Sequence, residues 1–527
     1  MNSGGAFDWL LRGGRVWDGR GGEGVVADVG LRGEKIAAVG DLSQAEARQV
    51  VEAEGLWVCP GFIDAHSHSD AYLLVEPSAA SKIHQGVTTE ITGNCGASAA
   101  PRFGGYELPS DWRAQVYPRP WRTVAEYREL LAEARPAVHS RMLAGHRALR
   151  AAVMGAAPRA ARPDEVRQMV RLLEQAMEEG AAGFSTGLIY APAMFADREE
   201  LLALARTAAA RGGLYATHMR SEGARLLEAV EEALDLSKTS GVPLQISHLK
   251  TAGEANWGKC SALLERIRTA RAEGMDVASD RYPYTASATD LDILLPEWAE
   301  QGGREAILER LRTPATLRRI RDEMAAARPD AYWDGVWIGS THAPAHAPFT
   351  GRPLCELARA WRMHPLDAAL RLMDTDDLYT GAFFFGMSEA NMDRILAEPW
   401  VMIGSDASLR APTGPLAADH PHPRAYGTFP RFLRRVLDSH SMSPGEAIRK
   451  MTSLPAERFH LRGRGLLEPG AWADVVLLDP RTFRDQATYA KPHAFSSGLY
   501  AVWVNGTPAI LNGKDTGLRA GRYLDEA

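Results

Sequence analysis

The pattern of hydrophobic and polar positions divides the 527-residue chain into three regions. Residues 1–58 and 461–527 contain short segments of alternating polarity separated by glycine, which is typical of antiparallel strands. Residues 59–460 alternate short apolar runs with longer amphipathic stretches, which favours a parallel sheet surrounded by helices. We therefore expect an α/β protein with a central domain at 59–460 and a small β-sandwich domain built from both termini.

One helix of the central region is predicted with particular clarity. Pro163 suits a first helical turn, Asp164 favours the positive end of the helix dipole, and Gly180 can end the helix. The hydrophobic residues at helical spacing between them are Val166, Met169, Val170, Leu173 and Met177. The segment 182–187 that follows is typical of a buried strand, so strand and helix alternate here.

Eight candidate strands can be placed in the central region, and each ends at polar residues. In chain order these ends are His66/His68, Asn94-Cys95, His146, Ser185-Thr186-Gly187, His218, His248, Asp280 and Asp406. Eight strand–helix units predict a TIM-like (β/α)8 barrel, whose active site lies at the carboxyl ends of its strands. We expect these polar groups to meet at that face.

The repeat is interrupted between Pro283 and Trp400 by far more sequence than a loop of ordinary length. We interpret the first part, at about 283–345, as an inserted subdomain over the barrel mouth that could act as a lid. Several loop histidines fit polar loop positions or lid contacts better than catalysis, namely His342, His346, His420 and His422.

The strand ends carry a set of residues suited to binding metal. His66 and His68 lie two positions apart in an extended segment, so their side chains point the same way. The complete candidate set is His66, His68, Cys95, His218, His248 and Asp406. Imidazole, thiolate and carboxylate together suit zinc, and a bridging thiolate allows one or two ions. Taken singly, each residue has a simpler structural explanation, but their coincidence at strand ends favours a metal centre.

A metal at this position indicates hydrolysis at a carbonyl or related centre, because bound metal lowers the pKa of water to about 7. Asp406 beside the metal could accept the proton of that water and pass it to a leaving group. Tyr190 or His146 could donate a hydrogen bond to the developing oxyanion. The candidate substrate-binding residues follow strand ends or lie in nearby loops, and are Lys250, Tyr282 and Arg424. Arg424 could hold a carboxylate through two parallel hydrogen bonds.

Composition narrows the class of protein. The formal net charge is −6 and no basic stripe stands out, which argues against nucleic-acid or membrane-surface partners and favours a small-molecule substrate. The four cysteines do not resemble a disulfide framework, and no signal peptide or membrane span is predicted, so we expect a cytoplasmic protein. The oligomeric state is not predicted.

These motifs resemble the amidohydrolase superfamily and, within it, the N-acyl-D-amino-acid deacylases. The matching segments are 60–68, 86–96, 185–192, 217–223, 245–250, 280–284, 404–406, 422–424 and 426–431. The resemblance implies zinc-dependent hydrolysis of an N-acyl-D-amino acid to a carboxylate and a free D-amino acid. It implies a tight zinc on Cys95, His218 and His248, and a second, weaker position framed by His66, His68 and Asp406. Asp406 would be the general base and acid.

The resemblance also implies that Lys250, Tyr282 and Arg424 grip the α-carboxylate of the substrate. The chain lacks the lysine that many superfamily members carry after the fourth strand, which fits a cysteine in its place. The stretch from Asp406 to Arg424 is longer than expected, and residues 286–297 contain no lysine or arginine to clamp an acidic side chain. We therefore expect neutral or apolar D-amino acids. The alternatives are a cyclic-amide hydrolase of the dihydroorotase or hydantoinase type, and a non-catalytic metal-binding scaffold.

Overall fold

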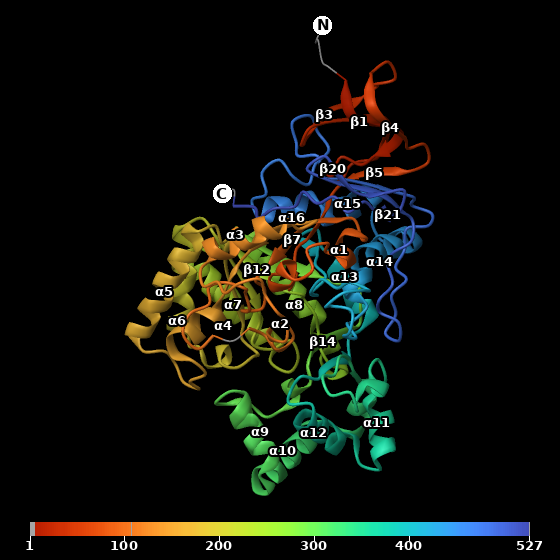
Figure 1. Cartoon of the computed structure of the whole chain (residues 1–527). Helices are drawn as coiled ribbons and strands as arrows, with labels where there is room; N and C mark the ends of the chain where they lie inside the picture. The colour runs from red at the N-terminus through yellow and green to blue at the C-terminus, as the bar shows by residue number, and fades with distance from the viewer. Residues whose placement is uncertain (1–5, 107, 526–527) are drawn as a thin grey trace.

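The computed structural model describes residues 6–106 and 108–525. Figure 1 shows a β domain at one end, a barrel surrounded by helices in the middle, and a mainly helical subdomain at the other end. The N-terminal strands and the strands near the C-terminus lie together in the β domain at the top of the view.

The β domain is formed from the two terminal regions. Its strands are β1 (Phe7–Val16), β2 (Val25–Arg32), β3 (Lys35–Gly40), β4 (Ala47–Glu52), β5 (Trp57–Pro60), β18 (Val475–Leu478), β19 (Leu499–Val504), β20 (Thr507–Leu511) and β21 (Lys514–Asp515). Among the described residues they join into one sheet of order β21-β20-β19-β18-β5-β1-β2-β3, with β4 paired to β1. The pairing of β5 with both β1 and β18 joins the N-terminal and C-terminal strands edge to edge, so both termini build the predicted β domain.

The barrel strands run parallel, as predicted. They are β6 (Phe62–Asp64), β7 (Val87–Thr92), β8 (His139–Met142) with its continuation β9 (Ala144–Gly145), β10 (Gly183–Gly187), β11 (Leu214–His218), β12 (Leu244–Ile246), β13 (Val277–Arg281) and β17 (Val401–Ile403). The pairing runs β6-β7-β8 and β17-β13-β12-β11-β10-β9. The two parts close on each other where the Ala65 amide donates to the Ile403 carbonyl at 3.1 Å. The (β/α)8 prediction is confirmed.

Helices surround this barrel. They are α1 (Ala80–Ile83), α2 (Ser110–Arg113), α3 (Val124–Ala134), α4 (His146–Met154), α5 (Pro163–Glu178), α6 (Arg198–Ala210), α7 (Leu226–Ser240), α8 (Cys260–Ala272), α13 (Glu389–Ala397), α14 (Arg424–Ser439), α15 (Pro444–Met451) and α16 (Ser453–Arg458). The predicted helix after Arg162 is α5, which buries Met169 and Leu173 against the barrel core. Within the described ranges, no helix is long and apolar enough to cross a membrane.

The barrel interior is filled by side chains. Ile63, Ile91, Leu143, Ala216 and Met402 belong to one buried cluster that includes residues from strands all around the barrel. Side chains of α16 and the loop after it complete this cluster below the strands. The interior is therefore a packed core, and the polar strand ends form a floor for the site above it.

The inserted subdomain has its own sheet and core. Its elements are β14 (Ala286–Asp290), α9 (Arg304–Arg312), α10 (Pro314–Ala327), β15 (Val336–Ile338), α11 (Leu354–Trp361), α12 (Pro365–Thr375) and β16 (Gly381–Phe385). The separate core runs from Leu291 to Ala382, so the subdomain extends well past the predicted end near 345. The reason is that β16 returns to pair with both β14 and β15, a long-range contact that local pattern does not reveal.

Candidate metal centre and active site

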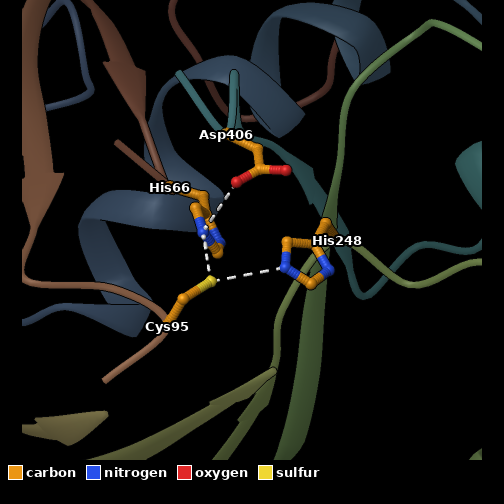
Figure 2. Close-up of side chains that lie close together, drawn as sticks. All are labelled: His66, Cys95, His248 and Asp406. Atoms are coloured by element: carbon orange, nitrogen blue, oxygen red, sulfur yellow. Dashed lines mark hydrogen bonds and ion pairs between the residues drawn. The ribbon is translucent and has the colours of Figure 1, made fainter. Parts of the chain in front are cut away.

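Four of the predicted ligands point toward one another at the carboxyl ends of the strands (Figure 2). The Cys95 sulfur lies 3.4 Å from Nε2 of His66 and 3.4 Å from Nε2 of His248. Asp406 Oδ1 lies 3.4 Å from Nε2 of His66 and 3.0 Å from Nε2 of His68. These residues come from four separate strand ends, so the barrel itself assembles the cluster.

The remaining predicted ligand, His218, lies beside His248, with their ring centroids 4.5 Å apart. Ligand atoms of His218, Glu222 and His248 lie within 4.8 Å of one another and form a second group able to hold a metal. Both ring nitrogens of His218 are buried and lack a hydrogen-bond partner among the described residues. A buried imidazole whose two nitrogens lack partners, beside a histidine that contacts a thiol, fits the nitrogen and sulfur preference of zinc.

The backbone at the site is conformationally strained. Cys95, His248 and Asp406 have φ values of 51°, 37° and 51°, in the left-handed region that residues with a side chain rarely adopt. Such residues cost on the order of 1–3 kcal/mol each and persist only where the surrounding structure imposes them. At Gly404 a Cβ atom would lie 2.6 Å from Cβ of His66, so only glycine permits this close approach. The fold thus holds the ligand set in place.

Two carboxylates orient the ligand histidines. Asp280 Oδ1 lies 3.0 Å from Nδ1 of His66 and accepts the backbone amide of His248 at 2.8 Å. Glu222 Oε1 lies 2.9 Å from Nδ1 of His248. A carboxylate on the far nitrogen fixes the tautomer and direction of a metal-binding imidazole. Sequence reasoning assigned no role to Glu222, although it lies four residues after His218 in a segment that carries the family resemblance.

A buried charged network lies beneath the first two histidines. The Lys82 ammonium is fully buried, 2.8 Å from Asp64 Oδ2 and 3.1 Å from Glu90 Oε1, and it donates to the Ala407 carbonyl at 2.8 Å. Ser405 also donates to Asp64, at 2.6 Å. Breaking a buried pair of this kind is strongly destabilising because it leaves a charge uncompensated. The network therefore ties the segment that carries His66 to the segment that carries Asp406.

Asp406 is held ionised by its neighbours. Burial alone would raise the pKa of this carboxyl, but Arg424, His248 and His68 outweigh that effect and hold the pKa well below its usual range. Arg424 Nη1 lies 2.9 Å from Asp406 Oδ2, and Nη2 donates to the Ala288 carbonyl at 3.3 Å. Asp406 is therefore ionised at neutral pH.

The three predicted substrate-binding residues lie close together around the Tyr282 ring. Lys250 Nζ lies 2.8 Å from Nδ1 of His248 and forms an ion pair with Glu222. The Tyr282 hydroxyl is buried without a hydrogen-bond partner in the described part of the chain. Arg424 lies 4.8 Å and Lys250 5.9 Å from the Tyr282 ring centroid. Although burial raises the pKa of Tyr282, Lys250, Arg281 and Arg424 lower it overall. The three predicted residues thus form one cluster, in which each of the two cations is also paired with a carboxylate of the site.

The two candidates for the oxyanion donor lie in different surroundings. The Tyr190 ring is 5.2 Å from the His218 ring, and its hydroxyl lies 3.2 Å from Thr289 Oγ1 at the edge of the insertion. His146 is fully buried at the start of α4, with Nε2 2.7 Å from Glu200 Oε1 of α6. Arg150 pairs with the same carboxylate. The structure therefore brings Tyr190 to the site but directs His146 into an ion-pair network between two helices.

A cavity of about 540 Å³ adjoins Tyr190 and is lined by α4, by the insertion, and by Gly105, Tyr106, Leu108, Pro109 and Arg113. Its charged lining residues are Arg113, Arg147, Asp290, Asp292, Glu300, Arg304 and Glu305. Burial raises the pKa of Asp292 to about 6 and that of Glu300 to about 8. The segment 286–297 supplies no cation, as the sequence indicated, but Arg147 from α4 reaches the same space.

Comparison with known proteins places this geometry in a family. The amidohydrolase family model matches residues 49–510. The chain belongs to the amidohydrolase family. This amidohydrolase is 39% identical to D-aminoacylase from Alcaligenes xylosoxydans xylosoxydans over 520 residues, covering 98% of this chain and 97% of the relative. It is 39% identical to N-acyl-D-glutamate deacylase of the same organism over 524 residues, covering 98% and 96%.

Solved structures agree. A D-aminoacylase crystal structure superimposes on this amidohydrolase with a TM-score of 0.84 at 37% identity, covering 99% of this chain and 100% of that chain. N-acyl-D-glutamate deacylase from Bordetella bronchiseptica, complexed with zinc and a phosphonate inhibitor, gives a TM-score of 0.84 at 36% identity with the same coverage. A D-hydantoinase matches with a TM-score of 0.55 at 15% identity, covering 99% of each chain, which reflects a shared fold alone.

Proposed function

We propose that this amidohydrolase uses zinc to cleave the amide bond of N-acyl-D-amino acids, giving a carboxylate and a free D-amino acid. The observation that carries the proposal is the thiol of Cys95 between two imidazoles, with the ionised Asp406 beside them. The full-length relatives named above, a D-aminoacylase and an N-acyl-D-glutamate deacylase, support the substrate class.

We propose two metal positions, as the family resemblance implies. Cys95, His218 and His248 would hold a tight zinc, and His66, His68 and Asp406 would frame a second, weaker position that shares Cys95. A solved structure of a D-aminoacylase with a binuclear metal centre supports the proposal of two metal positions. When bound, zinc polarises the amide carbonyl and lowers the pKa of water.

The protein side chains perform the remaining work. Asp406 takes the proton of the attacking water and passes it to the departing nitrogen, because its carboxylate is ionised and lies at the ligand cluster. The Tyr190 hydroxyl donates a hydrogen bond to the developing oxyanion. Lys250, Tyr282 and Arg424 bind the α-carboxylate and so align the amide with Asp406. His146 has no part in this scheme, because Glu200 occupies its ring nitrogen.

We further propose a preference for neutral or apolar D-side chains and a cytoplasmic location. The first rests on the absence of a lysine or arginine from residues 286–297, four of which line the cavity beside Tyr190. The second is supported by four cysteines that are free thiols in the structure.

The direct test is to assay the zinc-loaded protein with the N-acetyl-D and N-acetyl-L forms of Met, Leu, Phe and Glu. We expect turnover of the D forms, with Met, Leu and Phe preferred over Glu. Preference for L forms, or turnover of hydantoin with none of the linear amides, would refute the assignment. If D-Glu is preferred and Arg147→Ala removes that preference, the side-chain proposal fails while the reaction class stands.

Glu222→Gln is expected to weaken zinc binding by about 10- to 100-fold, the usual cost of losing an orienting partner of a ligand. The substitution keeps the shape of the side chain but removes the charge next to His248 and Lys250. Competition with a chelator measures the affinity for zinc. Glu254→Gln is the matched control, because Glu254 is an exposed carboxylate in the segment that follows β12. Unchanged zinc affinity in Glu222→Gln would show that this carboxylate does not orient His248.

A further inference from the structure

A long segment leaves the β domain and reaches the substrate side of the barrel. Residues 479–498 connect β18 with β19, and Figure 1 shows them in blue, running past α14 toward the inserted subdomain. We call this segment the strap. Its two sides are joined by hydrogen bonds between the backbones of Arg484 and Ser497. At its tip, the backbones of Thr488 and Lys491 form a closed turn that presents Tyr489.

Tyr489 packs against the inserted subdomain. Its ring centroid lies 4.8 Å from that of Phe385, 5.7 Å from that of Phe383 and 6.1 Å from that of Trp337. At Gly351 of the same subdomain, a Cβ atom would lie only 2.9 Å from the Tyr489 carbonyl oxygen. The tip of the strap is therefore packed closely against the inserted subdomain.

Histidines fasten the strap to the long loop that follows Asp406. Nε2 of His420 donates to the Tyr489 carbonyl at 2.6 Å, and Nε2 of His493 donates to the Asp419 carbonyl at 2.8 Å. Nδ1 of His493 then accepts from the Tyr426 hydroxyl at 2.9 Å. The extra length of the loop is thus used to bind the strap.

A hydrogen-bonded chain leads from the strap to the substrate pocket. His422 is buried, and its Nδ1 accepts the backbone amide of Arg424 at 3.0 Å. The proton of the neutral ring is then on Nε2, which lies 3.1 Å from the Tyr489 hydroxyl and donates to it. Arg424 in turn lies against Asp406 and over the Tyr282 ring. The Tyr489 hydroxyl therefore fixes the orientation of the His422 imidazole, which in turn accepts a hydrogen bond from the backbone amide of Arg424.

We infer that Tyr489 is a positioning residue for Arg424, so that the β domain takes part in recognising the substrate carboxylate. The inference rests on the proposed function, in which Arg424 binds that carboxylate. Tyr489 acts through its hydrogen bond to His422, which accepts the backbone amide of Arg424.

The test compares Tyr489→Phe with the wild-type protein in the zinc-loaded form. Phenylalanine keeps the ring packing and removes only the hydroxyl, so the fold is retained, which thermal unfolding checks. We expect the KM for N-acetyl-D-leucine and the Kd for free D-leucine to rise about 5- to 10-fold, the cost of one hydrogen bond. Lys491→Ala, an exposed position at the same tip, is the control and should leave both values unchanged.

A double-mutant cycle on the Kd of D-leucine separates positioning from general loosening. If Tyr489 acts through Arg424, adding Tyr489→Phe to Arg424→Ala produces no further loss of affinity. Losses that multiply in the double variant, or a Tyr489→Phe protein that binds like Lys491→Ala, would overturn the inference. A wild-type protein that turns over no N-acyl-D-amino acid would instead refute the proposed function, so the two failures are distinguishable.

Discussion

Asp406→Asn is expected to lower kcat for N-acetyl-D-leucine by about 100- to 10,000-fold, the range supplied by a positioned general acid–base group. Asparagine keeps the size of the side chain but cannot take or return a proton. The change also removes the ionic partner of Arg424. The tight zinc should remain, because Cys95, His218 and His248 are untouched. Single-turnover kinetics and metal analysis of the purified variant measure the two effects separately.

The control for this variant is Asp438→Asn, a highly exposed carboxylate whose ion pair with Arg434 lies within α14. It should retain wild-type kcat and zinc content. If Asp406→Asn kept most of its turnover, the proton would have to travel through another group. If it lost turnover together with the tight zinc, Asp406 would be a ligand of the tight site instead of the base.

Cys95→Ala is expected to weaken zinc binding by more than about 100-fold, since loss of an orienting partner alone costs 10- to 100-fold. The thiol is the only sulfur in a set otherwise made of imidazoles and carboxylates, and it lies 3.4 Å from two of the imidazoles. It is also the ligand that the two proposed positions share. Turnover at limiting zinc should fall in parallel, and excess zinc should restore only part of it.

Zinc content after dialysis and chelator competition measure this change. Cys355→Ser, a free thiol in the inserted subdomain, is the matched control and should keep wild-type affinity. A Cys95→Ala protein with full zinc content and normal turnover would show that imidazoles and carboxylates suffice, and would remove the central support for the proposed function.

The sequence predicted the barrel and the ligand cluster because both depend on local pattern and topology. Each ligand follows a buried strand, and parallel strands bring their carboxyl ends to one face. We could therefore predict that His66, Cys95, His248 and Asp406 meet without knowing which way each side chain points. His146 satisfies the same positional rule, yet its ring turns toward Glu200, and that direction depends on where α6 packs.

What the sequence could not predict depends on contacts between distant segments. Glu222 was part of a recognised segment, but its contact with His248 is visible only once two strand ends lie side by side. The insertion boundary was placed too early because β16 pairs far back along the chain. The Tyr489–His422 hydrogen bond joins residues 67 positions apart in different domains, and no local pattern marks either of them.

The separate core of the inserted subdomain has a consequence for how substrate range can change. Residues 291–382 have an apolar core of their own, while the segments that carry His66 and Asp406 are braced by the buried Lys82 network on the barrel side. Substitutions in the core of the inserted subdomain can therefore accumulate without disturbing the metal centre in the barrel. The strap limits this freedom at one place, because Phe383, Phe385 and Gly351 must keep their fit to Tyr489. Engineering of new preferences for the substrate's side chain or acyl group should begin in the inserted subdomain and leave its contacts with Tyr489 intact.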